Sequence, residues 1–431
     1  MRLEVRYDTG DASHVVGHLL NAQRTIYFQY AAAFRELGIG LSPFKLPTEL
    51  EDPVEERTRT YHGLHGLFND SLPDGWGLIL MERALRARGV DPDRITALDR
   101  LAFIGTRGMG ALTYHPPTDR DGEDPLDIDL TEVAAQSQRI LEGSTEDILP
   151  ALIRAGGSPM GARPKVVAGV RADYGHLVTG TADLPVGYSH WLIKFAAKED
   201  PKDMGPIEAA YADLAREAGI TFPRTHLFMA RDGRRYFGVE RFDRDPEHPA
   251  RRIHVHTFAG LIHHDHRFPG QDYTDLLKAT RILTQNHQDV VEAFRRMVFN
   301  ILAHNRDDHT KNFAFQMSAA GAWRLAPAYD VTYSAGPAGE HTMMVAGAGP
   351  APTRRHVDAV AEASSLEPRQ AREVLEKVQA AVAQWPAIAA RHGVTPASVG
   401  TIQRRLDEVR AQFNDTSAAP PLRPRRRGPV T

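Results

Sequence analysis

Hydrophobic and polar residues alternate along the first fifty residues, which predicts β-strands. Apolar side chains recur at every second position in three short runs: Leu3, Val5, Tyr7; Val15, Gly17, Leu19; and Ile26, Phe28, Tyr30. A period of two places successive side chains on opposite faces of a sheet. The intervening D-T-G-D and L-N-A-Q segments fit hairpin turns. The beginning of the chain is therefore expected to be mainly β.

A helical pattern follows. The run L-I-L-M-E-R-A-L-R-A-R predicts a helix with Asp74 as its cap and Gly89 at its end. Further helices are expected over 131–143, 145–154, 207–219, 273–283, 287–304, 354–363, 368–384 and 395–413. Residues 116–129 are rich in Pro, Gly and Asp and indicate a linker, whereas the Ser-, Pro- and Arg-rich composition after residue 414 predicts disorder. The Arg cluster of this tail is expected to be solubilising rather than a nucleic-acid site.

Composition narrows the class of protein. The 431 residues are 42% hydrophobic and 25% charged, as in ordinary globular proteins of two or three domains. A net charge of −3 gives no general basic field for nucleic acid or membranes. The absence of cysteine excludes disulfides, thiolate metal sites and cysteine catalysis. No apolar leader and no uncharged run long enough to span a membrane is visible, so a cytoplasmic protein is expected.

The stretch from Phe299 to Asp330 carries the clearest chemistry. An apolar helical run leads into H-N-R-D-D-H-T-K-N-F, and a predicted hairpin (313–317, turn 318–322, 323–325) then delivers A-Y-D-V. Phosphoryl transfer needs one carboxylate near the attacking hydroxyl, and an Asn with a second Asp to hold magnesium on the phosphates. Asp307, Asn312 and Asp330 stand in that order. The pattern therefore favours a kinase site over a solvated loop at a helix end.

Two earlier segments fit nucleotide binding. G-G-S-P-M-G-A-R-P-K precedes the apolar strand V-V-A-G-V, and its small residues would let backbone N–H groups approach an anion. The segment lacks the G-K-[ST] ending of a P-loop, and a plain turn remains an alternative reading. Lys194 lies inside the apolar strand W-L-I-K-F and needs a partner, for which Glu208 on the next helix is the candidate. The alternative is that Lys194 lies on an edge strand and that its side chain points to water.

Residues 222–230 and 235–242 predict another hairpin, which ends in V-E-R-F-D-R. In the kinase order of elements, this strand leads to the hinge that meets adenine. The histidine-rich stretch 254–267 could suggest zinc, but it lacks an H-E-x-x-H motif. The favoured interpretation of these histidines is a polar surface.

With these motifs in place, the chain resembles the HipA family of serine/threonine protein kinases, the toxin halves of bacterial toxin–antitoxin pairs. The motifs Y-F-Q-Y, L-S-P-F-K-L-P and F-N-D-S-L-P-D-G-W-G resemble the family's N-terminal subdomain, and the motifs described above match its kinase part in order. The resemblance implies an α+β, kinase-like two-lobed fold with a mainly β N-terminal subdomain, a Gly-rich loop and a mostly α-helical C-terminal lobe. The expected divisions are 1–115, 116–245 (remaining N-lobe), 246–413 (helical lobe) and 414–431 (tail).

The resemblance also implies roles for particular residues. Asp307 would orient or deprotonate the acceptor hydroxyl, and Asn312 and Asp330 would bind Mg²⁺. Asp308 stands where family members commonly have a small residue, and the spacing to Asn312 favours Asp307 as the catalytic carboxylate. Ser158 occupies the position of the family's autophosphorylated serine, whose modification expels the loop and abolishes ATP binding. The implied ATP-contacting residues are Met160, Gly161, Ala162, Arg163, Pro164, Lys165, Lys194, Glu240, Arg241, Phe242, His309, Thr310, Lys311, Asn312, Tyr329 and Asp330.

The function implied by the resemblance is an ATP- and Mg²⁺-dependent protein kinase that arrests growth and is associated with persistence. Its target would be a translation factor such as an aminoacyl-tRNA synthetase. A HipB-like helix-turn-helix antitoxin would neutralise it and connect it indirectly to operator DNA. Two alternatives stay open, a catalytically silent co-repressor subunit and a small-molecule kinase.

Overall fold

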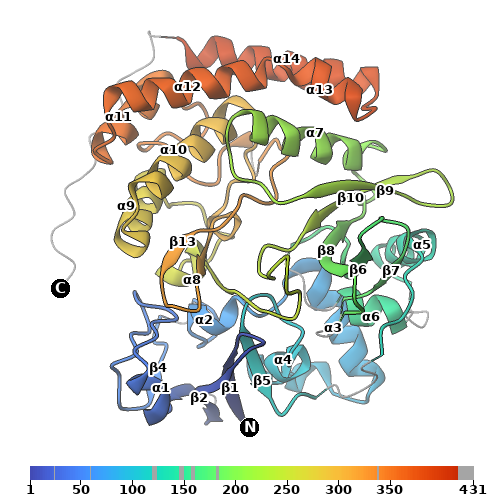
Figure 1. Cartoon of the computed structure of the whole chain (residues 1–431), viewed down its shortest axis with the longest axis vertical. Helices are drawn as coiled ribbons and strands as arrows, with labels where there is room; N and C mark the ends of the chain where they lie inside the picture. The colour runs from blue at the N-terminus through green and yellow to red at the C-terminus, as the bar shows by residue number, and fades with distance from the viewer. Residues whose placement is uncertain are drawn as a thin grey trace. The chain divides into compact units, whose positions relative to one another are not determined.

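The alternating pattern at the start of the chain forms a five-stranded antiparallel sheet with the order β4-β3-β2-β1-β5 (Figure 1). Its strands are β1 (Arg2–Asp8), β2 (Ser13–Ala22), β3 (Thr25–Tyr30), β4 (Val54–Glu55) and β5 (Leu112–His115). Leu3, Val5 and Tyr7 of β1 are all buried, as their period of two predicts. The sheet therefore has a buried face that the sequence pattern specified.

The computed structural model describes residues 1–23, 25–58, 60–118, 124–144, 150–156, 161–180, 184–336 and 339–415. These residues form two compact units. The first unit contains 1–205, 223–265 and 314–322, and the second contains 206–222, 266–313 and the chain from 323 onward. The fold is α+β, with a β-rich N-terminal region and a helical C-terminal region, as predicted.

Helices α1 (Ala32–Glu36), α2 (Gly66–Asn69), α3 (Gly75–Ala87), the 3-10 turn η1 (Pro92–Arg94) and α4 (Ala97–Ile104) lie between β3 and β5 in the chain. Asp74 occupies the N-cap position of α3, as predicted, but its side chain makes no capping hydrogen bond to that helix. The expectation that the Asp74 carboxylate caps α3 is thus wrong. Its oxygen is already engaged by the backbone N–H of Gly161.

A second antiparallel sheet of the first unit has the order β7-β6-β8-β10-β9. Its strands are β6 (Lys165–Arg171), β7 (Leu177–Thr179), β8 (Tyr188–Lys194), β9 (Thr225–Met229) and β10 (Arg235–Glu240). Helices α5 (Leu130–Leu141) and α6 (Pro150–Gly156) contribute to the same core, in which Trp76, Leu152 and Trp191 are buried. The first part of the predicted helix 145–154, residues 145–149, lies outside the described residues.

The histidine-rich stretch forms β11 (His254–Thr257) and α8 (Phe258–Ile262). Its interpretation as polar surface is wrong for His254 and His256, which are 1% and 0% exposed. The Asp70 carboxylate accepts hydrogen bonds from Nδ1 of His256 at 2.6 Å and from the backbone and hydroxyl of Thr257. Within the described residues, no group of His, Asp or Glu has the arrangement of a metal site. The histidines instead complete a buried polar network of the first unit.

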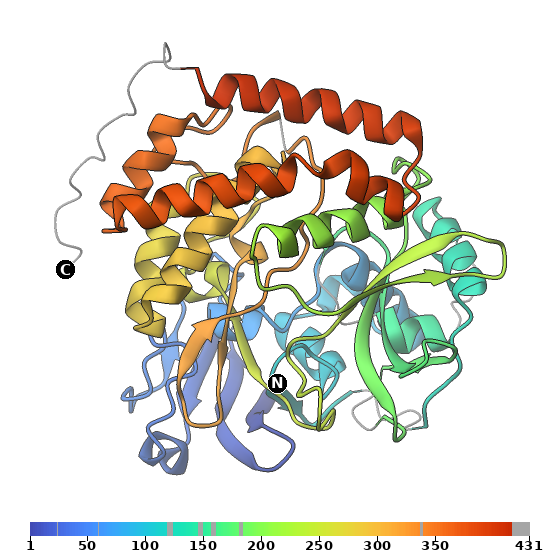
Figure 2. The ribbon, with the colours of Figure 1, turned by 45° about the horizontal axis from the view of Figure 1, so that its top comes forward.

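The second unit is helical. Its main elements are α7 (Met204–Glu217, from Pro206 on), α9 (Tyr273–Thr284), α10 (His287–Leu302), α11 (Arg354–Ala363), α12 (Pro368–Val382), α13 (Trp385–Arg391) and α14 (Pro396–Phe413). Helix α10 packs against α9, α12 and α14, and α11 to α14 are the orange and red ribbons of Figure 2. Helix α13 was not predicted, and the tail from residue 416 lies outside the described residues. None of the helices that the structure describes has the length and apolarity needed to cross a membrane.

The predicted hairpin after the polar stretch is present as β12 (Ala314–Met317), a turn, and β13 (Trp323–Leu325). The backbone N–H of Ser318 donates to the carbonyl of Ala322 at 2.9 Å and closes the turn. Strand β12 pairs with β11, with His256 opposite Phe315. The chain between Asn312 and Asp330 is thus shaped as the sequence predicted.

Candidate active site

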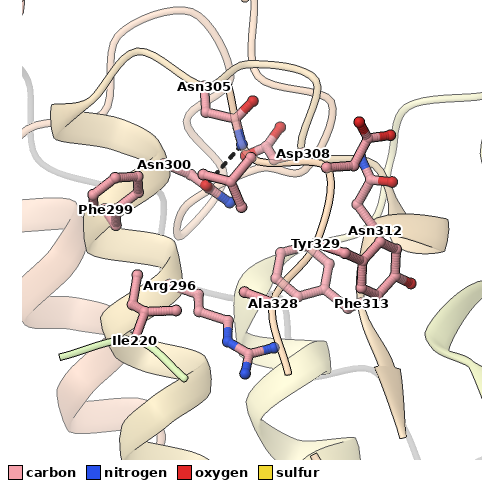
Figure 3. Close-up of a pocket in the computed structure, with 12 residues that line it drawn as sticks. Ile220, Arg296, Phe299, Asn300, Asn305, Asp308, Asn312, Phe313, Ala328 and Tyr329 are labelled. Carbon is pink, nitrogen blue, oxygen red and sulfur yellow. Dashed lines mark hydrogen bonds between the residues drawn. The ribbon is translucent and has the colours of Figure 1, made fainter. Parts of the chain in front are cut away.

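The polar stretch begins where α10 ends. The apolar face of that helix is buried, and the chain leaves it through His304, whose φ of 52° is left-handed. The Nδ2 group of Asn305 donates to Oδ1 of Asn300 at 3.0 Å, and Asn300 in turn donates to the Tyr273 hydroxyl at 3.0 Å. Figure 3 shows the first of these bonds at the top of a small pocket. Buried amides therefore fix the path of the chain into the next residues.

The two adjacent carboxylates have different environments. The Asp308 side chain is fully buried, and it accepts hydrogen bonds from the Tyr273 hydroxyl at 2.7 Å, from Nδ1 of His341 at 2.8 Å and from the backbone N–H of Thr342 at 2.8 Å. The Asp307 side chain is 48% exposed. A carboxylate that accepts a substrate proton must be reachable by the substrate. Exposure and spacing thus both favour Asp307 as the catalytic group, while Asp308 holds the loop.

Asn312 and Asp330 line the same pocket, which also contains Asp308 and Tyr329 (Figure 3). Asn312 ends a 3-10 turn, η2 (Thr310–Asn312), and its Nδ2 group donates to the backbone carbonyl of Asp307 at 2.6 Å. Asp330 has a φ of 54°, a left-handed conformation that Asp tolerates better than most residues. The second unit thus brings Asn312 and Asp330 to one pocket, and Asp307, which is not among the residues that line it, is joined to Asn312 through its backbone carbonyl.

The other predicted residues of this stretch are tied to the same loop. The Tyr329 hydroxyl donates to the carbonyl of Lys311, so that the two segments flanking the hairpin are joined. Nε2 of His309 lies 3.9 Å from Oδ1 of Asp307, and its ring contacts the ring of His266 with centroids 5.0 Å apart. Thr310 and Lys311 are buried. An imidazole therefore lies beside the exposed carboxylate of Asp307.

The first unit contains the predicted phosphate-contacting residues. Ser158 and Met160 lie outside the described residues. Lys165 and Lys194 are register partners on the adjacent strands β6 and β8, and they are only 4% and 9% exposed. Paired residues on neighbouring strands have Cβ atoms about 5 Å apart on the same face, where two like charges repel. The register thus places two of the predicted phosphate-contacting lysines side by side on neighbouring strands, and their contact with phosphate stays a prediction.

Arg163 lies in the predicted phosphate-covering loop that precedes β6, and a carboxylate holds its side chain. Its guanidinium makes a bidentate contact with Asp200, with Nε to Oδ2 at 2.9 Å and Nη2 to Oδ1 at 2.9 Å. Oδ2 of Asp200 also accepts the backbone N–H of Ala197 at 2.8 Å. Such a fork fixes the orientation of the arginine. The loop therefore enters β6 with its cationic side chains already positioned.

The segment predicted to meet adenine follows β10. The Glu240 carboxylate pairs with Arg224, with Nε at 2.6 Å from Oε2. The Arg241 side chain is buried and makes a bidentate contact with Asp243, at 2.9 and 2.7 Å. The carbonyl of Phe242 accepts Nε2 of Gln316. The side chains and backbone N–H groups of Glu240 and Arg241 are thus engaged within the first unit itself. Contact of this segment with adenine stays a prediction.

Glu208 is buried on α7 in the second unit. This helix is anchored by Tyr211, whose hydroxyl donates to the carbonyl of Ala303 at 2.9 Å and whose ring contacts Trp385 at 5.3 Å between centroids. The pairing of Glu208 with Lys194 stays a prediction. Sequence reasoning missed the roles of Tyr273, His341 and Asp308, because their partners are distant in the chain; the doubled aspartate was the one visible signal.

The oxygen donors of the second unit fit magnesium. Asn312 and Asp330 supply a carboxamide and a carboxylate on one pocket, and hard oxygen ligands of this kind suit Mg²⁺, which usually keeps waters and substrate phosphates as its other ligands. Neither a cysteine nor a histidine cluster of the zinc type occurs among the described residues. The chemistry of the donor set therefore agrees with a metal that binds together with a nucleotide.

Comparison with known proteins decides the family. A model of the HipA-like C-terminal domain matches residues 157–385, and a model of the HipA N-terminal domain matches residues 7–115. The first match alone covers more than half of the 431 residues. The chain belongs to the HipA family. The resemblance inferred from its motifs is thus confirmed.

Two further known proteins are similar to this chain. A Sinorhizobium fredii protein named "Putative kinase Y4dM" is 27% identical to this chain over 278 residues. The match covers 61% of each protein, so the present chain spans about three fifths of that relative's length. HipA of Shewanella oneidensis MR-1, solved with HipB and operator DNA, matches with a TM-score of 0.69 and 18% identity over 95% of this chain and 96% of its own. That likeness shows the fold.

Proposed function

We propose that this HipA-family chain is an ATP- and Mg²⁺-dependent protein serine/threonine kinase and the toxin half of a toxin–antitoxin pair. One observation carries the proposal: the exposed Asp307 is joined through its carbonyl to Asn312, which lines a pocket with Asp330. A base, an amide and a second carboxylate are the parts that phosphoryl transfer requires. The name of the Sinorhizobium relative as a kinase supports the same activity.

In this proposal the second unit carries the catalytic and metal groups. Asp307 orients the acceptor hydroxyl and takes its proton as the hydroxyl oxygen bonds to the γ-phosphorus of ATP, while the bond from that phosphorus to the β–γ bridging oxygen breaks and ADP leaves. Asn312 and Asp330 would hold Mg²⁺, which would supply positive charge against the phosphates. Tyr329 and residues His309 to Lys311 complete that side of the nucleotide site. Each role falls on a residue held by the loop geometry described above.

The first unit carries the nucleotide-contacting groups. Lys194 and Lys165 compensate phosphate charge, and the loop from Met160 to Pro164 covers the phosphates. The backbone of Glu240 to Phe242 contacts adenine, and Glu208 pairs with Lys194. Ser158 is the autophosphorylation site, where about two added negative charges beside ATP would repel it.

The biological role follows from the family. The Shewanella HipA was solved with HipB and operator DNA. We infer that a HipB-like helix-turn-helix antitoxin neutralises the present chain and brings it to operator DNA, and that the kinase phosphorylates a translation factor such as an aminoacyl-tRNA synthetase. Cytoplasmic location is part of the same proposal.

Label transfer from [γ-³²P]ATP in a bacterial lysate tests the activity. Wild-type protein is expected to label itself and one cellular protein, Asp307→Ala to label neither, and Ser158→Ala to label the target but not itself. Phosphosite mapping by mass spectrometry identifies the modified residues. Undiminished self-labelling of Ser158→Ala at another residue would remove the Ser158 assignment.

The same experiment separates the two other candidates. A silent co-repressor subunit would transfer no label to any protein while still binding its antitoxin. A small-molecule kinase would leave all label in metabolites. The intact set Asp307, Asn312, Asp330 and Lys194 favours activity over the silent subunit.

A further inference from the structure

The nucleotide loop of the first unit is attached to the turn that begins α3. The Asp74 carboxylate accepts the backbone N–H of Gly161, and the carbonyl of Gly161 accepts the backbone N–H of Trp76 at 3.1 Å. The indole N–H of Trp76 donates to the carbonyl of Lys165 at 3.1 Å. One short turn, Asp74 to Trp76, therefore binds the loop both at Gly161 and at Lys165.

The fit between turn and loop is close. Gly75 has a φ of 46°, and a Cβ atom there would lie 2.7 Å from the Cα of Ala162 and from the carbonyl oxygen of Gly161. Gly161 has a φ of 104°, and a Cβ atom there would lie 2.2 Å from Nζ of Lys165. The positive φ favours glycine at both positions, and at Gly75 the backbone of Gly161 and Ala162 also leaves no space for a Cβ atom.

The anchor of the turn is rigid. Trp76 is fully buried in a core that also contains Val166 of β6 and Ile193 of β8. The carbonyl of Pro164, between the two attached points, accepts the N–H of Phe195 at 2.8 Å. The described part of the loop, Gly161 to Lys165, is therefore held from α3 on one side and from β8 on the other.

We propose that the Asp74–Trp76 turn is a clamp that positions the nucleotide loop, and that Asp74 is a positioning residue for ATP binding. The turn belongs to the part matched by the HipA N-terminal domain, and the loop to the part matched by the HipA-like C-terminal domain. The N-terminal domain thus sets the kinase domain's affinity for nucleotide. This inference rests on the proposed kinase function.

Kinetics and hydrogen exchange on the full chain test the clamp. Asp74→Ala removes a charge-assisted acceptor, and we expect the KM for ATP to rise ~10-fold with kcat within about twofold. The amides of Gly161 and Ala162 should exchange ~10-fold faster without nucleotide, whereas that of Val167 in β6 should not change. Asp74→Asn keeps an acceptor oxygen and should restore most of both properties. Asp93→Ala, in the exposed turn after α3, is the matched control.

Unchanged KM together with unchanged exchange at Gly161 in Asp74→Ala would overturn the proposal. If that variant does not fold, Trp76→Phe carries the test, because it keeps an aromatic ring in the core but removes the indole N–H that donates to the carbonyl of Lys165, and it should raise KM and the exchange rates alike. Failure of the kinase proposal looks different: wild-type protein would not bind Mg²⁺–ATP in calorimetry, while the exchange comparison would still report on the clamp.

Discussion

Nδ1 of His341 donates a hydrogen bond to the buried carboxylate of Asp308 at 2.8 Å, while the neighbouring Asp307 side chain stays 48% exposed. The same Asp308 carboxylate accepts the backbone N–H groups of Thr342 and Met343. Burial and the negative charge of Asp308 raise the pKa of Tyr273 well above its ordinary value, so its hydroxyl remains a donor. Asp308 thus fixes the loop, whereas the Asp307 side chain stays accessible, as the proposed catalytic role requires.

Replacing each of the two aspartates by alanine in turn should show that one stabilises the fold and that the other is needed for phosphate transfer. Asp308→Ala leaves several buried donors without an acceptor, and we expect it to lower the free energy of unfolding by about 3 kcal/mol. Asp307→Ala alters an exposed side chain and should change that free energy by less than about 0.5 kcal/mol, yet abolish label transfer. Urea unfolding and phosphate transfer measure the two effects. Equal stability losses in both variants would contradict this division of roles.

The left-handed backbone of Asp330 gives a second test. Asparagine tolerates a positive φ at least as well as aspartate, so Asp330→Asn should stay folded with a free energy of unfolding within about 0.5 kcal/mol of wild type. The loss of the carboxylate charge in Asp330→Asn should lower the rate of Mg²⁺-dependent phosphate transfer ~100-fold or more. Asp330→Val should lose activity and also about 1–2 kcal/mol of stability, because a β-branched residue is strained there. An active Asp330→Asn variant would argue against a metal role.

The paired lysines of β6 and β8 should respond to nucleotide. Removing one ammonium group lessens the repulsion between two buried like charges and also weakens the attraction for phosphate. We expect Lys194→Met to lose most of the rise in Tm that Mg²⁺–ATP causes in wild-type protein. Lys198→Met, beyond the end of β8, serves as the control. A full ATP-induced rise in Lys194→Met would mean that this lysine does not contact phosphate.

Stability should fall in mild acid because of buried histidines in the first unit. Burial lowers the pKa of His254 to about 4 and that of His65 to about 4, below the ordinary value of 6.5. Between pH 6.5 and 4 the unfolded chain therefore binds protons that the folded chain does not, and stability decreases as the pH falls through this window. For His254 the loss approaches roughly 3 kcal/mol at the acid end.

Urea unfolding of wild type at pH 7, 6 and 5 measures this loss. His254→Gln keeps a donor for the carbonyl of Leu41, which lies 3.0 Å from the imidazole, but it cannot take up a proton. The variant should therefore show a shallower dependence on pH. Identical profiles for wild type and variant would show that His254 does not cause the decrease.

The sequence alone determined many helices and strands of this protein and the order of its motif residues. Alternation along β1 and the apolar faces of α10 and α14 predicted those elements, because side-chain periodicity follows directly from backbone geometry. The order Asp307, Asn312, Asp330 and the hairpin between them also follow from residues close together in the chain. The motifs alone predicted that the chain belongs to the HipA family.

The tertiary structure alone decided which polar groups are buried and which stay exposed. The spacing to Asn312 favours Asp307 over Asp308, but only the approach of Tyr273 and His341 buries Asp308. Asp74 looks like a helix cap, and only the approach of Gly161, 87 positions later, gives its carboxylate a different partner. Burial and hydrogen bonding depend on which distant segments meet, and that is a property of packing rather than of local pattern.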